Sequence, residues 1–301
     1  MSGRSFVRSD MLSCLSFGDV QFGYKALRQL EHCGFFRLQD VFSHHHGFNV
    51  QEFLMQSRNI LRCDEFSHLS QTHMGTPRGL YAFHQGNNQS ARAFAMGSVK
   101  GIECKQEYLK LSGLDSLLDV STRSHLAQYF SNSFPENQEK FQKNCEKLFS
   151  ICQLVCEWIL LRVLQGCKHP DPSKILELHN KNDHVLEVKL YPIADSGQVE
   201  NRFVPHKDLS TLTLLLEDSP GLQVLLNESD WISAEQNTFD PCSMLVNAGD
   251  FLETIIGVKS AVHKVECAQE RLSVAFFYTP NWDAEIEPGS LAGDRMPYLL
   301  P

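Results

Sequence analysis

Hydrophobic positions recur with the period of an α-helix through the first half of the chain. The pattern predicts helices over residues 19–34, 49–63 and 135–165. Gly34 suits the end of the first helix, while Pro135 and Gly166 suit the start and the end of the longest one. Apolar residues three and four positions apart predict that this long helix packs onto a core. They are Phe141, Leu148, Cys152, Val155, Ile159 and Val163.

After residue 180 the period changes to that of a β-strand. Leu186, Val188 and Leu190 alternate with polar residues, as in a half-buried strand. Further short apolar runs, separated by turn sequences, span residues 211–216, 222–226, 243–247, 251–256 and 272–279, and another short strand is expected at residues 34–38. Several short strands with regular turns predict a mainly β fold with flanking helices (α+β), either a sandwich or a jelly roll.

The same pattern shows no internal repeat and no clear linker. We expect a mostly helical region over residues 1–180, a jelly-roll core over residues 181–288 and a C-terminal tail over residues 289–301. Residues 64–113 mix glycine, asparagine and glutamine with aromatic residues. We interpret this stretch as loops near the mouth of a pocket.

The net charge and the composition limit which binding partners and which compartment are expected. The 36 acidic residues outnumber the 27 basic ones, giving a formal charge of −9, so a nucleic-acid partner is not expected. The sequence indicates neither a secretory signal nor an apolar run long enough to cross a bilayer, so no membrane association is expected. The ten cysteines are scattered, which favours reduced thiols and a cytoplasmic protein. The oligomeric state cannot be inferred from the sequence.

Candidate metal ligands occur in the β-rich half. His206-Lys-Asp208 places two ligand side chains two residues apart, so an extended segment directs both to the same face. His263 lies near the start of a later strand and is the candidate for a third ligand. Two histidines and one carboxylate leave open positions on the ion, which suits non-haem Fe(II).

A second His-x-Asp motif, His169-Pro-Asp171, is interpreted differently. It follows the end of a helix, and Asp171 is expected to cap the helix that begins near Pro172. The first motif also has a structural interpretation, in which His206 lies in a loop and His263 at a strand edge. The spacing alone leaves both interpretations open.

An arginine and a serine, Arg271 and Ser273, lie two residues apart on an otherwise apolar strand. A buried arginine needs an anionic partner, and its guanidinium can hold a carboxylate through two hydrogen bonds. The serine hydroxyl would add a third donor. The alternative is a structural ion pair between Arg271 and an acidic neighbour such as Glu270 or Glu253.

Together these residues resemble the 2-oxoglutarate/Fe(II)-dependent dioxygenase superfamily, and within it the isopenicillin N synthase-like family. The similarity follows one order over residues 19–47 and 186–288. Its motifs are Cys33-Gly-Phe-Phe36, His46-Gly47, Leu190-Tyr-Pro192, Val204-Pro-His-Lys-Asp208, Thr211-Leu-Thr-Leu-Leu-Leu216, Gly221-Leu-Gln-Val224, Leu245-Val-Asn-Ala-Gly-Asp250, Lys259-Ser-Ala-Val-His-Lys-Val265, Arg271-Leu-Ser273 and Phe277-Tyr-Thr-Pro280.

This resemblance implies a double-stranded β-helix with iron bound at one open end. His206, Asp208 and His263 would be the metal ligands. Residues 1–180 would correspond to the N-terminal region of the family, which packs on the core. A zinc hydrolase also uses two histidines and a carboxylate, but it would give no role to the arginine and the serine.

The resemblance also implies the cosubstrates 2-oxoglutarate and O2. Arg271 and Ser273 would hold the far carboxylate of 2-oxoglutarate, and Tyr191 corresponds to a tyrosine that often helps to hold cosubstrate or substrate. Oxidative decarboxylation of 2-oxoglutarate would be coupled to hydroxylation, desaturation or ring closure of a small organic substrate. The alternatives are an Fe(II) oxidase that does not use 2-oxoglutarate and a non-catalytic binding or sensor protein on the same fold.

Overall fold

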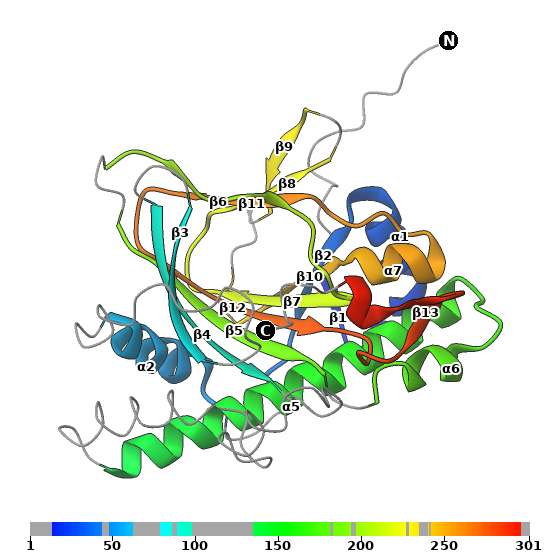
Figure 1. Cartoon of the computed structure of the whole chain (residues 1–301), viewed down its shortest axis with the longest axis horizontal. Helices are drawn as coiled ribbons and strands as arrows, with labels where there is room; N and C mark the ends of the chain where they lie inside the picture. Colours follow the sequence, from blue (N-terminus) through cyan, green and yellow to red (C-terminus); the bar gives the residue numbers. More distant parts are fainter. Residues whose placement is uncertain are drawn as a thin grey trace.

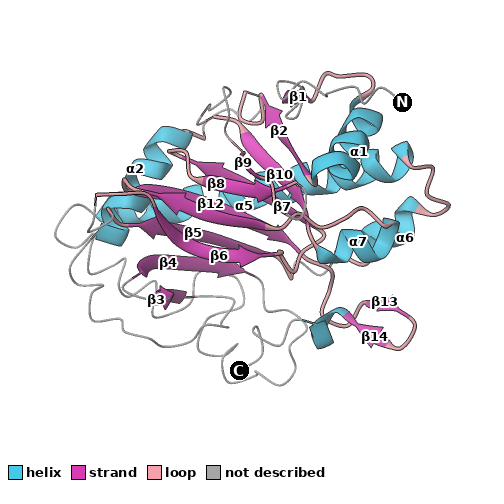
Figure 2. Ribbon diagram, turned by 90° about the horizontal axis from the view of Figure 1, so that it is seen from above, coloured by secondary structure: helices cyan, strands magenta, loops and turns pink. Residues whose placement is uncertain are grey.

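The chain folds around two β-sheets that face each other (Figure 1, Figure 2). The computed structural model describes residues 14–43, 48–62, 79–85, 89–97, 135–180, 183–193, 197–226, 229–234, 240 and 242–295. The larger sheet has the strand order β1-β2-β10-β7-β12-β5-β4-β3, and the smaller one has the order β6-β11-β8-β9. This arrangement confirms the predicted jelly-roll core with flanking helices.

The strands of the larger sheet come from both halves of the sequence. They are β1 (Cys14–Ser16), β2 (Phe35–Gln39), β3 (Gly79–Gln85), β4 (Gln89–Gly97), β5 (Val185–Tyr191), β7 (Leu212–Glu217), β10 (Met244–Ala248) and β12 (Arg271–Tyr278). The smaller sheet consists of β6 (Glu200–His206), β8 (Leu222–Leu225), β9 (Trp231–Ser233) and β11 (His263–Cys267). A separate hairpin, β13 (Glu285–Glu287) and β14 (Ser290–Leu291), precedes the 3-10 helix η4 (Ala292–Arg295).

Helices flank the sheets, and those at residues 22–33, 50–62 and 135–166 confirm the predicted helical segments. They are α1 (Phe22–Cys33), α2 (Val50–Arg62), α5 (Pro135–Gly166), α6 (Pro172–Glu177) and α7 (Asp250–Ile256). Gly34 ends α1 in a left-handed conformation, with φ 78° and its N–H bonded to the Leu30 carbonyl. Asp171 caps α6 as expected, because its carboxylate accepts a hydrogen bond from the Lys174 amide at 3.1 Å.

The long helix α5 crosses beneath the larger sheet (Figure 1) and contacts α1, β7 and β12. Its predicted apolar residues, from Phe141 to Val163, are buried in the main core. By length and composition alone, Glu139–Gly166 could cross a membrane, which corrects the expectation that no apolar run is long enough. The core helix of a globular protein passes the same test, and 56% of the relevant stretch is buried inside this protein.

Two predicted segments differ from the structure. Residues 251–256 belong to the helix α7 and not to a strand; Gly249 is the N-cap of this helix, and Gly257 ends it with φ 76°. A short apolar run cannot by its period distinguish a strand from a helix. Within residues 64–113, the stretches Gly79–Gln85 and Gln89–Gly97 form a hairpin that extends the sheet beyond β5, where loops had been predicted. The rest of that stretch lies outside the described residues.

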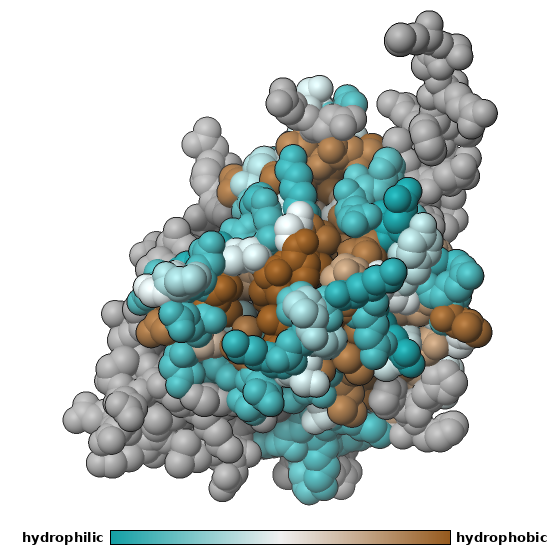
Figure 3. All heavy atoms as spheres, turned by 90° about the vertical axis from the view of Figure 1, so that its right-hand side faces the viewer, coloured by the Kyte–Doolittle hydropathy of each residue, from teal (hydrophilic) through white to brown (hydrophobic). Residues whose placement is uncertain are grey.

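Polar side chains dominate the side of the molecule that carries α6, α7 and β13, with apolar side chains visible between them (Figure 3). Large apolar side chains that are exposed, such as Val20, Leu154 and Ile193, come from separate segments. Val20 had been assigned to the first helix, but it precedes α1 and is fully exposed. The boundaries proposed at residues 180 and 288 stay a prediction.

The start of α7 holds the loop that contains Asp208. The Asp250 amide donates to the Asp208 carbonyl at 2.9 Å, and the Phe251 amide donates to the Ser210 carbonyl at 3.1 Å. Gly249 permits this approach, because a Cβ atom there would lie 2.1 Å from the Ser210 carbonyl oxygen. The position of Asp208 therefore depends on a glycine in a different element.

We predict that Gly249→Ala destabilises the fold by about 3 kcal/mol, because the added methyl group must displace the backbone of the loop at Ser210. Urea unfolding measures this change. Gly18→Ala is the matched control, since a Cβ atom at Gly18 would meet nothing within 4 Å, and its effect should stay within about 0.5 kcal/mol. Equal stability of the two variants would contradict the described packing.

Candidate metal centre

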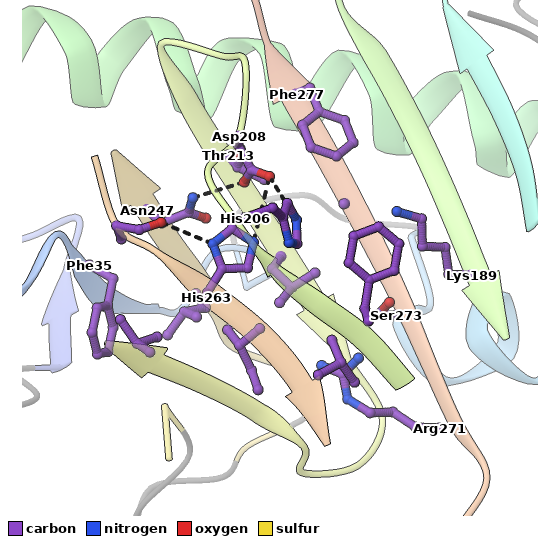
Figure 4. A pocket seen from close by; sticks show the side chains of 18 of the residues that line it. Phe35, Lys189, His206, Asp208, Thr213, Asn247, His263, Arg271, Ser273 and Phe277 are labelled. Carbon is purple, nitrogen blue, oxygen red and sulfur yellow. Dashed lines mark hydrogen bonds and ion pairs between the residues drawn. The ribbon is translucent and has the colours of Figure 1, made fainter. Parts of the chain in front are cut away.

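Two strands of the smaller sheet bring the predicted metal ligands together. β6 ends at His206 and β11 begins at His263, and these two residues are paired in the antiparallel register. The Asp208 Oδ1 atom lies 3.6 Å from His206 Nε2 and 3.5 Å from His263 Nε2 (Figure 4). Each residue offers one ligand atom, and the three atoms lie within 4.8 Å of one another. The structure thus assembles the three predicted residues at one point.

Hydrogen bonds away from this point fix the orientation of all three side chains. His206 Nδ1 donates to the Val204 carbonyl at 2.8 Å, and His263 Nδ1 donates to the Ala261 carbonyl at 3.1 Å. A histidine that donates from Nδ1 keeps Nε2 as the lone-pair atom, which is the form a metal binds. Asn247 Nδ2 donates to Asp208 Oδ2 at 2.9 Å, so Oδ1 faces the histidines. This donor set fits a divalent cation.

The charge state of the group also suits a cation. Burial alone would raise the pKa of Asp208, but the two histidines and the Asn247 amide together hold that pKa well below its usual range. Burial lowers the pKa of His263, although the Asp208 carboxylate opposes this shift. At neutral pH, Asp208 is therefore a carboxylate and His263 a neutral imidazole.

A cavity between the two sheets joins this group to the predicted carboxylate anchor. Arg271, Ser273 and Tyr191 line it together with His206, Asp208 and His263 (Figure 4). β12 directs Arg271 and Ser273 to the same interior face, because they are two residues apart. Tyr191 lies opposite Arg271 in the pairing of β5 with β12, and the guanidinium carbon is 5.8 Å from its ring centre.

Arg271 is 1% exposed and has a buried acidic partner. Its Nη2 atom donates to Glu217 Oε2 at 2.6 Å, and its Nε atom donates to the Ser219 carbonyl at 3.1 Å. An acidic partner of Arg271 had been one of the two interpretations of the sequence, but the expected residues are wrong. Glu217 was missed, although it ends an apolar strand at an inward-facing position.

The two acidic residues that had been expected beside Arg271 lie elsewhere. Glu270 pairs with Arg58 and Arg62 of α2, and Glu253 accepts a hydrogen bond from Lys207 at 2.8 Å. The signal that would have identified Glu217 is its place two residues after Leu215 and four after Thr213, both of which line the cavity.

Other residues of the site were also missed or assigned only to the scaffold. Lys189 lines the cavity on β5; its ammonium lies 2.6 Å from Glu187 and 4.6 Å from the ring centre of Phe203. Asn247 was not among the predicted site residues, but it orients a candidate ligand. His169 lies at the capped start of α6, where its ring nitrogen accepts from the Asp171 amide. His44, His45 and His46 lie outside the described residues.

Comparisons with known proteins find similar sequences and similar folds. The family model of the 2OG-Fe(II) oxygenase superfamily matches residues 160–280, the segment that contains all three candidate ligands and the anchor. The dioxygenase for auxin oxidation 1 of Arabidopsis thaliana, solved as its complex with 2-oxoglutarate, has a similar fold. Its TM-score is 0.62 at 14% sequence identity, covering 91% of this chain and 94% of that one.

Curated relatives share part of the sequence. Homoarginine-6-hydroxylase 2-ODD-C23.1 of Arabidopsis thaliana is 32% identical over 180 residues, which are 55% of this chain and 52% of that protein. 1-Aminocyclopropane-1-carboxylate oxidase 3 of Arabidopsis thaliana is 30% identical over 215 residues, 63% of each chain. The chain spans about half the length of most of these relatives. The segment at residues 160–280 is thus similar in sequence to the 2OG-Fe(II) oxygenase superfamily.

Proposed function

We propose that this protein is an Fe(II)- and 2-oxoglutarate-dependent oxygenase that oxidises a small organic substrate. The observation that carries the proposal is the convergence of His206, Asp208 and His263 at one side of a cavity whose other side presents Arg271. Two imidazole nitrogens and one carboxylate on one face of an ion leave room for a chelating cosubstrate and O2.

His206 Nε2, Asp208 Oδ1 and His263 Nε2 would hold the iron. When bound, iron with O2 and 2-oxoglutarate supplies the oxidising chemistry, which releases succinate and CO2. The protein contributes orientation and shelter from water. Asn247 keeps one oxygen of Asp208 directed at the metal position, and the backbone carbonyls behind the histidines keep both rings turned towards it.

Arg271 and Ser273 would bind the far carboxylate of 2-oxoglutarate, with Tyr191 beside them. The three side chains face one part of the cavity, and a guanidinium with a neighbouring hydroxyl is a strong donor set for a carboxylate. Such an anchor fixes the distance between the carboxylate and the metal, so it selects a dicarboxylate of matching length.

The substrate would occupy the part of the cavity next to the metal that Phe203, Phe277 and Lys189 line. Phe203 and Phe277 offer apolar surface, and the Lys189 ammonium offers a hydrogen-bond donor. A small organic molecule that has both an apolar part and a polar acceptor fits these walls.

One observation favours an alternative within the same superfamily. Because Glu217 already pairs with Arg271, the guanidinium has an anionic partner without any cosubstrate. An Fe(II) oxidase that takes its electrons from the substrate would not need a free anchor. The two candidates differ in whether 2-oxoglutarate binds to the iron form of the protein.

We predict that anaerobic protein loaded with Fe(II) develops a weak visible charge-transfer band when 2-oxoglutarate is added, because the cosubstrate chelates the metal. His206→Ala should abolish the band at concentrations that saturate the wild type. His169→Ala is the matched control, since His169 belongs to the other His-x-Asp motif, at the cap of α6, and it should leave the band unchanged. Titration followed by absorption measures both effects.

The outcomes separate the candidate functions. A band that requires His206, with succinate release in air, supports the proposed oxygenase. Iron binding with no band supports the oxidase that does not use 2-oxoglutarate. Absence of iron binding to the wild type would contradict both.

We also predict that Asn247→Leu weakens Fe(II) binding by about 10-fold to 100-fold, because Asp208 loses the hydrogen bond that orients it. Anaerobic metal titration measures the affinity. Asn281→Leu is the matched control: Asn281 is also buried, but it bonds to the Glu177 carbonyl away from the cavity. This control should lose stability and keep the wild-type affinity; equal loss of affinity in both variants would show a general effect of unfolding.

A further inference from the structure

A buried carboxylate behind the cavity bridges two arginines. Glu217 Oε2 accepts from Arg271 Nη2 at 2.6 Å, and Glu217 Oε1 accepts from Arg37 Nη2 at 3.2 Å. Arg37 Nη1 in turn donates to the Ser243 hydroxyl at 2.8 Å. The side chains of both arginines and of the glutamate are each 1% exposed. Ion pairs of this kind are hardly screened by solvent.

The sheet places these residues in one row. Arg37 comes from β2, Glu217 ends β7 and Arg271 begins β12, and Ser243 directly precedes β10. β2, β10, β7 and β12 are successive neighbours in the larger sheet. Only Arg271 of the three charged residues reaches the cavity wall, so Arg37 can influence a ligand only through Glu217.

The charges of the row do not cancel. Two guanidiniums and one carboxylate give the row itself a formal sum of one positive charge, in a region closed to water. A buried charge is unfavourable without an opposite charge beside it, and an anion that enters the cavity at Arg271 would add one. Without Arg37, the charges of Glu217 and Arg271 would sum to zero, and Arg271 would offer a weaker positive potential to a carboxylate.

We propose that Arg37 is a positioning residue of the cosubstrate site: it shares Glu217 with Arg271, so that Arg271 keeps positive charge for the far carboxylate of 2-oxoglutarate. This inference rests on the proposed function. Glu217 does pair with Arg271, but it divides its two carboxylate oxygens between Arg271 and Arg37. The negative charge of Glu217 then lowers the affinity for the dicarboxylate, and the positive charge of Arg37 offsets that effect.

The contacts around Arg271 hold its side chain in one position, so the row acts on a ligand through charge and not through movement of Arg271. The loop after β7 encloses its stem: the Ser219 carbonyl accepts from Nε, and a Cβ atom at Gly221 would lie 3.0 Å from Arg271 Cδ. Asp218 ties the same loop to Arg58 of α2 and accepts from the Leu272 amide. Because the stem of Arg271 is held in this way, the ionic partners of its guanidinium determine how strongly Arg271 attracts a ligand.

The test is the dissociation constant of 2-oxoglutarate for anaerobic protein loaded with Fe(II), followed by the charge-transfer band. Three variants change the net charge of the row: Arg37→Met removes one positive charge, Glu217→Gln removes the negative charge, and the double variant restores the original sum. Arg58→Met is the matched control, because it removes a positive charge that pairs with Asp218, next in sequence to Glu217, on the other side of the loop.

We expect Arg37→Met to weaken 2-oxoglutarate binding at least tenfold, by about the effect of one buried charge, and Glu217→Gln to strengthen it about tenfold. The double variant should return to within about threefold of the wild type, as should Arg58→Met. 2-Oxovalerate, which has a methyl group in place of the far carboxylate, should bind all five proteins equally. That result would confine the effect to the carboxylate anchor.

Several results would overturn the inference. If the double variant binds 2-oxoglutarate as weakly as Arg37→Met, or if 2-oxovalerate is weakened in parallel, Arg37 has only a structural role. If Arg37→Met does not fold, the comparison between Glu217→Gln and the double variant decides: equal affinities would contradict a role for Arg37. Failure of the proposed function is distinct, because the wild-type protein would then show no band at all.

Discussion

The antiparallel pairing of β6 with β11 is the constraint on which the site depends. It sets His206 opposite His263 at the open end of the smaller sheet, so that one short loop is enough to bring Asp208 between them. That loop is fixed from the other side by α7, whose first amides bind its carbonyls. The site therefore needs the sheet, the loop and the helix at once, and hydrogen bonds to other parts of the protein orient its three side chains.

A second feature is the row of charged residues in the larger sheet, across the cavity from the metal position. Alternation along β12, β7 and β2 turns Arg271, Glu217 and Arg37 inwards on three strands, where a jelly roll would otherwise have an apolar core. Buried charges in such a row are costly unless they are paired, and the row pairs two arginines with one glutamate. Under the proposed function, stability and ligand binding share the same residues at this end of the cavity.

Much of this organisation could be predicted from the sequence, because it depends on local pattern. The period of α5, the glycine that ends α1 and the cap at Asp171 are local signals, and the structure agrees with each. The candidate ligand motif was recognisable for the same reason, since two of its residues are only two positions apart in the sequence. His263 and the pair Arg271 and Ser273 were candidates from their positions on expected strands, and the ordered similarity to a known family implied their roles.

The features that were missed depend on contacts between distant segments. The partner of Arg271 lies 54 positions away and Arg37 lies 180 positions from Glu217, so neither ion pair has a local signal. β6 was not predicted, because its sequence contains polar residues and Pro205, which disfavour a strand by propensity. The segment after Gly249 was predicted as a strand because its apolar run is too short to show a period.

The most direct measurement of the central claim is a crystal structure of the protein grown without oxygen in the presence of Fe(II) and 2-oxoglutarate. We predict iron bound by His206, Asp208 and His263, with the far carboxylate of 2-oxoglutarate against Arg271 and Ser273. Iron bound by other residues, or 2-oxoglutarate bound away from Arg271, would contradict this claim.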